Sequence, residues 1–178
     1  REFLSLSGVG AASLLSANGL FGHDEAKRIR VAPFALEEAT IYEMQAAMAT
    51  GKETAVSLAK KYLQRIDAID KRGPAINSVI ELNPDALAIA RDLDDERKEK
   101  GPRGLLHGIP FTVKDIVNTG AVRTPFGAVP FRDNVPEYDA VAVARLRAAG
   151  AILIGKTTTP EFGSKCLTDS PLFGRTCN

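Results

Sequence analysis

Two short apolar runs, separated by one amphipathic helix pattern, constrain the fold of this chain more than any other feature. Residues 109–113 (IPFTV) and 151–154 (AILI) are bounded by turn-forming residues, which is typical of buried strands. Between them, residues 139–149 carry apolar side chains at helical spacing and end at Gly150. This order predicts a βαβ unit with parallel strands and a right-handed crossover. The predicted fold class is therefore α/β, with ligands beyond the carboxyl ends of the strands.

Capping signals and periodicity predict two helices before this unit. Thr40 and Glu43 form a capping box that starts a short helix over residues 41–50. A second, amphipathic helix follows and ends at Gly73. Its apolar stripe consists of Val56, Ala59, Leu63, Ile66 and Ile69.

One more strand and the starts of two helices are predicted from local patterns. Residues 76–82 (INSVIEL) show the partial alternation of a strand. A helix then begins with Asn83 as its cap and Pro84 at its first position. Asp139 is the predicted cap of the helix over 139–149.

Composition narrows the classes of function. Apolar residues make up 44% and charged residues 25%, and the net charge is +1, so no charge excess points to a nucleic-acid partner. No apolar run has the length of a membrane span, so stable membrane insertion is not expected. Cys166 and Cys177 have no nearby histidine and do not match the ligand spacing of a zinc site, so we expect no metal. We expect no cofactor either. The two cysteines either pair or are buried thiols, and the second interpretation is slightly favoured.

The N-terminal residues have the composition of an export signal. Residues 1–22 are rich in leucine and small residues, and Arg1 with the following Phe-Leu partly matches a twin-arginine signal. We therefore divide the chain into an export signal with its linker, 1–30, and a folded part, 31–178. The protein is then periplasmic or secreted, or cytoplasmic if residues 1–22 form an ordinary amphipathic helix. The first residue is not Met and the last residues are turn-like, so we expect a fragment truncated at both ends.

Two familiar motifs are rejected on structural context. Gly150, Gly155, Lys156 and Thr157 satisfy the phosphate-loop pattern, but the four residues within it have the composition of a strand rather than of a loop. No helix can follow, because three threonines and a proline come next. The sequence contains no Gly-x-Ser-x-Gly motif, so a serine–histidine hydrolase is not supported. His107 is interpreted as a structural residue.

Lys114 is the candidate catalytic residue. It stands where the apolar strand over 109–113 ends, directly before Asp115. A lysine at a strand end is usually a solvated surface residue. If it is buried, desolvation favours its neutral form, which can act as a base. Spacing alone leaves both interpretations open.

Several motifs together resemble those of one enzyme family. Residues 106–115 (LHGIPFTVKD) resemble the lysine motif of the amidase signature hydrolases, and residues 139–157 resemble the helix and strand that follow it. The match continues in family order through residues 159–163, 168–174, Thr176 and Asn178. The resemblance implies a mixed, mostly parallel sheet covered by helices on both faces. Residues 31–178 would be its N-terminal portion.

The resemblance also implies a mechanism. Family members use a Ser–cis-Ser–Lys triad, in which Lys114 would be the base that activates a nucleophilic serine through a bridging serine. Both serines and the glycine-serine-rich oxyanion loop would lie downstream of Asn178. Neither Ser164 nor Ser170 is their replacement, because Ser164 lacks glycine-rich surroundings and Ser170 precedes Pro171 in a turn region. We therefore expect this fragment alone to be inactive. We also expect it to fold poorly, because parallel strands need cover on both faces and the downstream part would supply much of it.

The expected function is hydrolysis of a small carboxylic amide by a stand-alone bacterial amidase. Two alternatives stay open within this fold: the A-subunit of an aspartyl/glutamyl-tRNA amidotransferase, and a non-catalytic amidase-like binding protein. The expected partner is a small-molecule amide, without nucleic acid.

Overall fold

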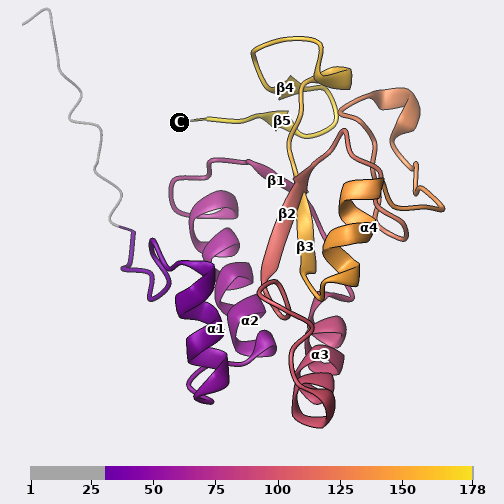
Figure 1. The fold of residues 1–178 in the computed structure, drawn as a ribbon. Coiled ribbons are helices and arrows are strands. Elements are labelled where there is room, and N and C mark those ends of the chain that lie inside the picture. Colours follow the sequence, from indigo (N-terminus) through magenta and orange to yellow (C-terminus); the bar gives the residue numbers. More distant parts are fainter. Residues whose placement is uncertain (1–30, 178) are drawn as a thin grey trace, which may run out of the picture. The chain divides into compact units, whose positions relative to one another are not determined.

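The computed structural model describes residues 31–177, so the predicted export signal lies outside the described residues. Helices and strands alternate along most of the chain (Figure 1). The helices are α1 (Ile41–Ala49), α2 (Ala55–Arg65), a π-helical segment (Ile66–Lys71), α3 (Ala86–Lys100) and α4 (Val141–Ala148). The strands are β1 (Val79–Leu82), β2 (Pro110–Lys114), β3 (Ile152–Thr157), β4 (Asp169–Ser170) and β5 (Gly174–Arg175). Short 3₁₀ turns occupy Val129–Phe131 and Glu161–Gly163.

Three strands form a mixed sheet in the order β1-β3-β2. β2 and β3 are parallel, so the predicted βαβ unit is confirmed, and β1 is antiparallel to β3. In the register, Lys114 pairs with Thr157, and Thr157 pairs with Val79. The carboxyl ends of β2 and β3 and the start of β1 therefore meet at one edge. The fold class is α/β, as the sequence predicted.

The main core lies between the sheet and the N-terminal helices. In Figure 1, α1 and α2 lie on one side of the strands, and α4 lies on the other. The core consists of Met44, Met48, Ala55, Leu58, Ala59, Ala86, Ala90, Leu93, Ile109, Ile152 and Ile154. The capping box at Thr40 is present and starts α1, as predicted. The predicted apolar stripe of α2 differs slightly from the buried face of the helix. Leu58, which is not in the predicted stripe, is fully buried, whereas Val56 and Leu63 are half-buried.

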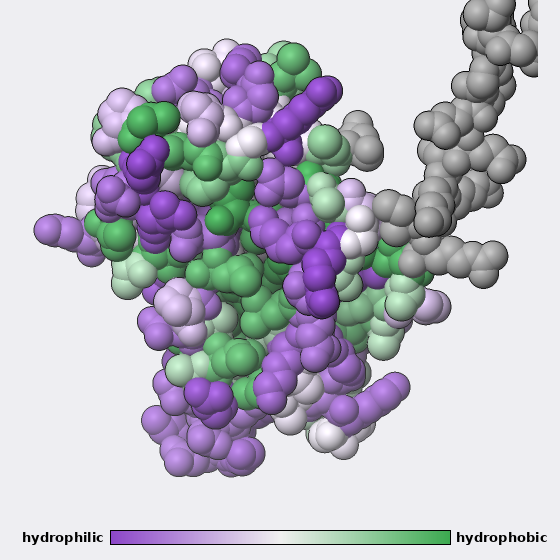
Figure 2. Space-filling model, turned by 180° about the vertical axis from the view of Figure 1, so that it is seen from behind, coloured by the Kyte–Doolittle hydropathy of each residue, from purple (hydrophilic) through white to green (hydrophobic). Residues whose placement is uncertain are grey.

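Apolar side chains also reach the surface. Figure 2 shows them in the middle of the face opposite to that of Figure 1, bordered by polar residues. Residues 31–177 include no helix that combines the length and the hydropathy needed to cross a membrane.

Local predictions were wrong at four places: the start of β1, Asn83, Pro84 and Asp139. The strand predicted over 76–82 begins only at Val79, since Asn77 has a left-handed φ of 58° that no strand accommodates. Asn83 is not a helix cap: its amide donates to Leu153 O at 2.8 Å, and α3 begins only after Asp85. Pro84 consequently lies in the turn before α3.

Asp139 was likewise predicted to cap a helix. The structure has Ala140 at that position, without a side-chain hydrogen bond. The carboxylate of Asp139 instead accepts the backbone N–H of Gly120 at 2.8 Å. It also forms an ion pair with Arg147, which fixes the loop before α4.

Candidate active site at the carboxyl ends of the parallel strands

Lys114 is the last residue of β2, where the sequence placed it. Its side chain is exposed in the described part of the chain. The next residue, Asp115, is fully buried, because successive side chains of an extended segment point to opposite faces. The residues after the strand form a loop, 115–127, that starts directly at the candidate base.

Asp115 is a buried carboxylate with only part of its hydrogen-bonding capacity used. One oxygen, Oδ2, accepts the N–H of Gly127 at 2.9 Å, whereas Oδ1 has no partner within residues 31–177. Burial raises the pKa of Asp115 to about 6, and the Gly127 N–H and the Lys156 ammonium oppose this increase.

Lys156 is the largest fully buried side chain that the structure describes. Its ammonium donates to the carbonyl of Val117 and to the hydroxyls of Thr119 (3.1 Å) and Thr124 (2.9 Å). Burial lowers its pKa to about 8, while the charge of Asp115 opposes this shift. Because all three acceptors belong to the loop 115–127, Lys156 ties that loop to β3.

Gly127 closes the loop against the segment that follows β3. Its φ is +66°, and a Cβ at this position would lie 2.7 Å from Thr159 O. Only glycine allows this approach together with the left-handed backbone. The loop is therefore held at three places: by Asp115, by Lys156 and by the contact with Thr159.

The rejected phosphate-loop pattern lies inside a strand. Gly155, Lys156 and Thr157 are the last three residues of β3. The ammonium of Lys156 is enclosed by protein, and Gly155 packs against the backbone of β1 at Glu81 O. A phosphate could reach neither group, so this pattern does not form a phosphate loop.

His107, Ser164 and Ser170, which the sequence analysis set aside as catalytic residues, all form hydrogen bonds within the fold. His107 is buried, and its ring nitrogens contact Leu93 O at 2.9 Å and the N–H of Arg103 at 3.3 Å, as expected of a structural residue. Ser164 is exposed and donates to Glu161 O at 2.7 Å. The hydroxyl of Ser170 is buried and donates to Gly127 O at 3.0 Å.

The cysteines require a correction. Cys166 and Cys177 are both free and exposed, so the expectation of buried thiols was wrong. Both lie beside the short hairpin of β4 and β5, where too little chain packs to cover them. Across residues 31–177 there is no group of three or more His, Cys, Asp or Glu side chains that could hold a metal ion.

Sequence reasoning missed the buried pair of charged residues behind Lys114. One signal was present: Lys156 directly follows the apolar run 151–154 and a glycine, so it was a candidate for a buried strand lysine. No comparable signal showed that its acceptors would be Thr119 and Thr124, more than thirty residues away.

Comparisons with known proteins place these features in a family context. A family profile described as Amidase matches residues 57–178. An acylamidase of Rhodococcus erythropolis is 38% identical over 139 residues, covering 76% of this chain and 28% of the relative. The A-subunit of the glutamyl-tRNA(Gln) amidotransferase of Salinispora tropica is 37% identical over 137 residues, covering 76% of this chain and 27% of the relative.

A solved structure shows the same fold. The native peptide amidase of Stenotrophomonas maltophilia superposes with a TM-score of 0.77 at 40% identity, covering 82% of this chain and 31% of that protein. The chain thus spans between a quarter and a third of the length of these relatives.

Proposed function

This chain belongs to the amidase signature family, and we propose that the protein containing it hydrolyses a carboxylic amide to an acid and an amine or ammonia. The observation that carries the proposal is the position of Lys114. It ends β2 at the edge where the carboxyl ends of both parallel strands meet, and ligands of such sheets bind at this edge. The family indicates amide hydrolysis as the reaction, and the edge of the sheet at Lys114 indicates where the substrate would bind.

Lys114 is proposed as the base of a Ser–cis-Ser–Lys triad. Its neutral amine takes a proton from the bridging serine, which takes one from the nucleophilic serine. The nucleophile attacks the amide carbonyl, and the tetrahedral oxyanion is held by backbone N–H groups of a downstream loop. As this intermediate collapses, the Lys114 ammonium returns its proton through the bridging serine to the leaving amine. Water, deprotonated through the same relay, then hydrolyses the acyl-enzyme to the acid and restores the nucleophilic serine.

To act as a base, Lys114 must be in its neutral form. A lysine is neutral near pH 7 where burial or a neighbouring positive charge lowers its pKa. Lys114 is exposed in residues 31–177, so the proposal requires that other parts of the protein cover it or bring a positive charge beside it. Asp115 and Lys156 are both fully buried, so the proposal assigns neither of them a contact with the substrate.

The test uses the longer protein and small aryl and alkyl amides, with released ammonia or amine as the readout. We expect Lys114→Ala to lower kcat by a factor of about 10²–10⁴, the range for loss of a general base. The matched control is Lys98→Ala, an exposed lysine on α3, which should leave kcat unchanged. Full activity of Lys114→Ala would refute the assigned base.

The same assay separates the alternatives. A member of an amidotransferase complex would release little ammonia without its partner subunits and would gain activity when they are added. A non-catalytic binding protein would bind an amide without hydrolysing it.

We also propose export to the periplasm or medium, on the composition of residues 1–22. The corresponding test fuses residues 1–30 to a reporter that is active only outside the cytoplasm.

A further inference from the structure

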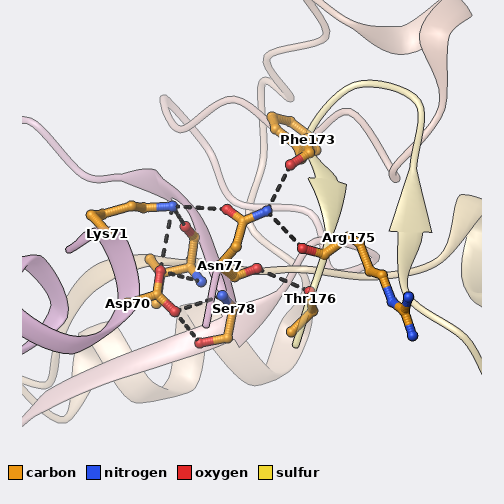
Figure 3. Close-up of polar contacts among 8 residues, drawn as sticks. Asp70, Lys71, Asn77, Ser78, Phe173, Arg175 and Thr176 are labelled. Carbon is orange, nitrogen blue, oxygen red and sulfur yellow. Dashed lines mark hydrogen bonds and ion pairs between the residues drawn. The ribbon is translucent and has the colours of Figure 1, made fainter. Parts of the chain in front are cut away.

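Asn77 lies where three segments of the chain meet, at the edge of the sheet that carries Lys114 (Figure 3). Its backbone N–H donates to Asp70 O, 3.1 Å away, in the π-helical segment. Two residues later β1 begins with Val79, which shares a row of the sheet with Thr157 and Lys114. Strands are spaced about 4.8 Å apart, so this row places Val79 about 10 Å from Lys114.

The side chain of Asn77 holds the backbone of the β4–β5 hairpin. Its amide nitrogen donates to Phe173 O at 2.7 Å and to Arg175 O at 3.2 Å. The hydroxyl of Thr176 returns a hydrogen bond to Asn77 O at 2.9 Å (Figure 3). The amide oxygen accepts from the Lys71 ammonium at 3.3 Å. Every polar group of Asn77 is thus used, and three of its contacts reach the hairpin.

Asn77 is itself fixed from the N-terminal side. The carboxylate of Asp70 accepts the hydroxyl and the N–H of Ser78 and the N–H of Val79. Although burial opposes it, these hydrogen bonds hold the pKa of Asp70 below its usual value. The left-handed φ of 58° suits asparagine better than most residues. The amide is therefore a donor with a set position.

The hairpin depends on such external contacts. β4 and β5 pair through two residues each, and an isolated hairpin of this size is not stable in water. Three further contacts hold this segment: the Ser170 hydroxyl donates to Gly127 O, the Arg123 guanidinium lies over the Phe173 ring at 5.6 Å, and the Cys177 N–H donates to Ile76 O at 2.9 Å. The first two lead back to the loop that starts at Lys114, and the third leads to the residue before Asn77.

We propose that Asn77 is a positioning residue for the reaction: it fixes the β4–β5 hairpin, and the chain that leaves Thr176, relative to Lys114. The inference rests on the proposed function, in which both serines lie downstream of Asn178. Asn77 lies two residues before Val79, which is about 10 Å from the base, and as an anchor it sets the starting point of that segment. Misplacement of reacting groups by about 1 Å can cost a factor of about 10² in rate.

The test compares two substitutions and one control in the longer protein. Asn77→Asp keeps the size of the side chain and removes its donor. Asn77→Gly keeps access to the left-handed backbone and removes the side chain. Asn83→Ala is the matched control, because it removes a buried amide-to-carbonyl hydrogen bond after the opposite end of β1.

Two readouts are measured: hydrogen exchange of the backbone amides in residues 168–177, and the separate values of kcat and KM. Both Asn77 variants should raise exchange in this segment about tenfold or more and lower kcat about tenfold or more, with a smaller change in KM. Asn83→Ala should lower the thermal midpoint while leaving both readouts as in the parent protein.

Unchanged exchange in the Asn77 variants would overturn the anchor. Raised exchange with unchanged kcat would overturn its role in positioning. A parent protein without amidase activity would overturn the proposed function and the catalytic half of this inference. In that event, exchange alone still decides whether Asn77 holds the hairpin.

Discussion

Replacement of Lys156 by methionine tests the buried cluster behind the candidate base. Lys156→Met keeps an unbranched apolar side chain and removes the ammonium. Three acceptors then lose their donor: the carbonyl of Val117 and the hydroxyls of Thr119 and Thr124. Asp115 loses the positive charge that opposes the increase in its pKa.

Two opposing contributions determine how much Lys156→Met changes the free energy of unfolding. Lowering the pKa of Lys156 from 10.5 to about 8 corresponds to about 3 kcal/mol of penalty on the buried charge at neutral pH, which methionine removes. Hydrogen bonds from a charged donor each contribute about 1.5–3 kcal/mol, and three are lost. We therefore expect a net loss of about 1.5–6 kcal/mol in the free energy of unfolding.

The pH dependence tests the coupling between Lys156 and Asp115. Asp115 has a pKa of about 6 in the folded state and 3.8 as its ordinary value, so the folded state binds more protons between these values. Stability therefore falls as the pH rises through this window. Without the Lys156 ammonium the pKa of Asp115 lies higher, and the window extends upward. The cost of Lys156→Met should be larger at pH 8 than at pH 5.5.

The assay is chemical denaturation of the longer protein at these two pH values. The matched control is Lys98→Met on α3, where an exposed lysine pairs only with exposed Asp95. We expect no measurable shift in its denaturation midpoint at either pH. An equal cost of Lys156→Met at pH 5.5 and pH 8 would refute the coupling to Asp115, and no cost at all would refute the role of the three hydrogen bonds.

Two further predictions concern the sheet and the isolated chain. Gly155→Ala should destabilise the protein by about 3 kcal/mol, the upper end for overpacking, because the new Cβ would lie 2.5 Å from Glu81 O and both groups are on paired strands; an unchanged thermal midpoint would contradict the close approach of β1 and β3. Residues 31–178 expressed alone should hydrolyse no amide, since they supply the base but not the nucleophile that the proposed mechanism needs; hydrolysis that disappears on Lys114→Ala would contradict this expectation.

Much of the fold could be predicted because its signals are local. The capping box of α1 lies within four residues, and the apolar runs that become β2 and β3 are short and bounded by turns. Helical periodicity located α2 and α4 for the same reason. These patterns need no knowledge of distant residues.

The predictions failed where a side chain had a choice between a local and a distant partner. Asn83 and Asp139 are good caps by residue type, but Leu153 O and the N–H of Gly120 compete for them in the folded chain. Asn77 interrupts an apparent strand because its amide reaches carbonyls almost a hundred residues away.

The sequence by itself determined the α/β class, the parallel pair of strands and the place of Lys114 at the end of β2, since each follows from the order of nearby residues. The tertiary structure alone decided the antiparallel pairing of β1, the burial of Lys156 beside Asp115 and the anchoring of the hairpin by Asn77. The physical reason is that burial and hydrogen bonding between distant segments depend on strand register. Register is settled only when the whole sheet and its core have packed.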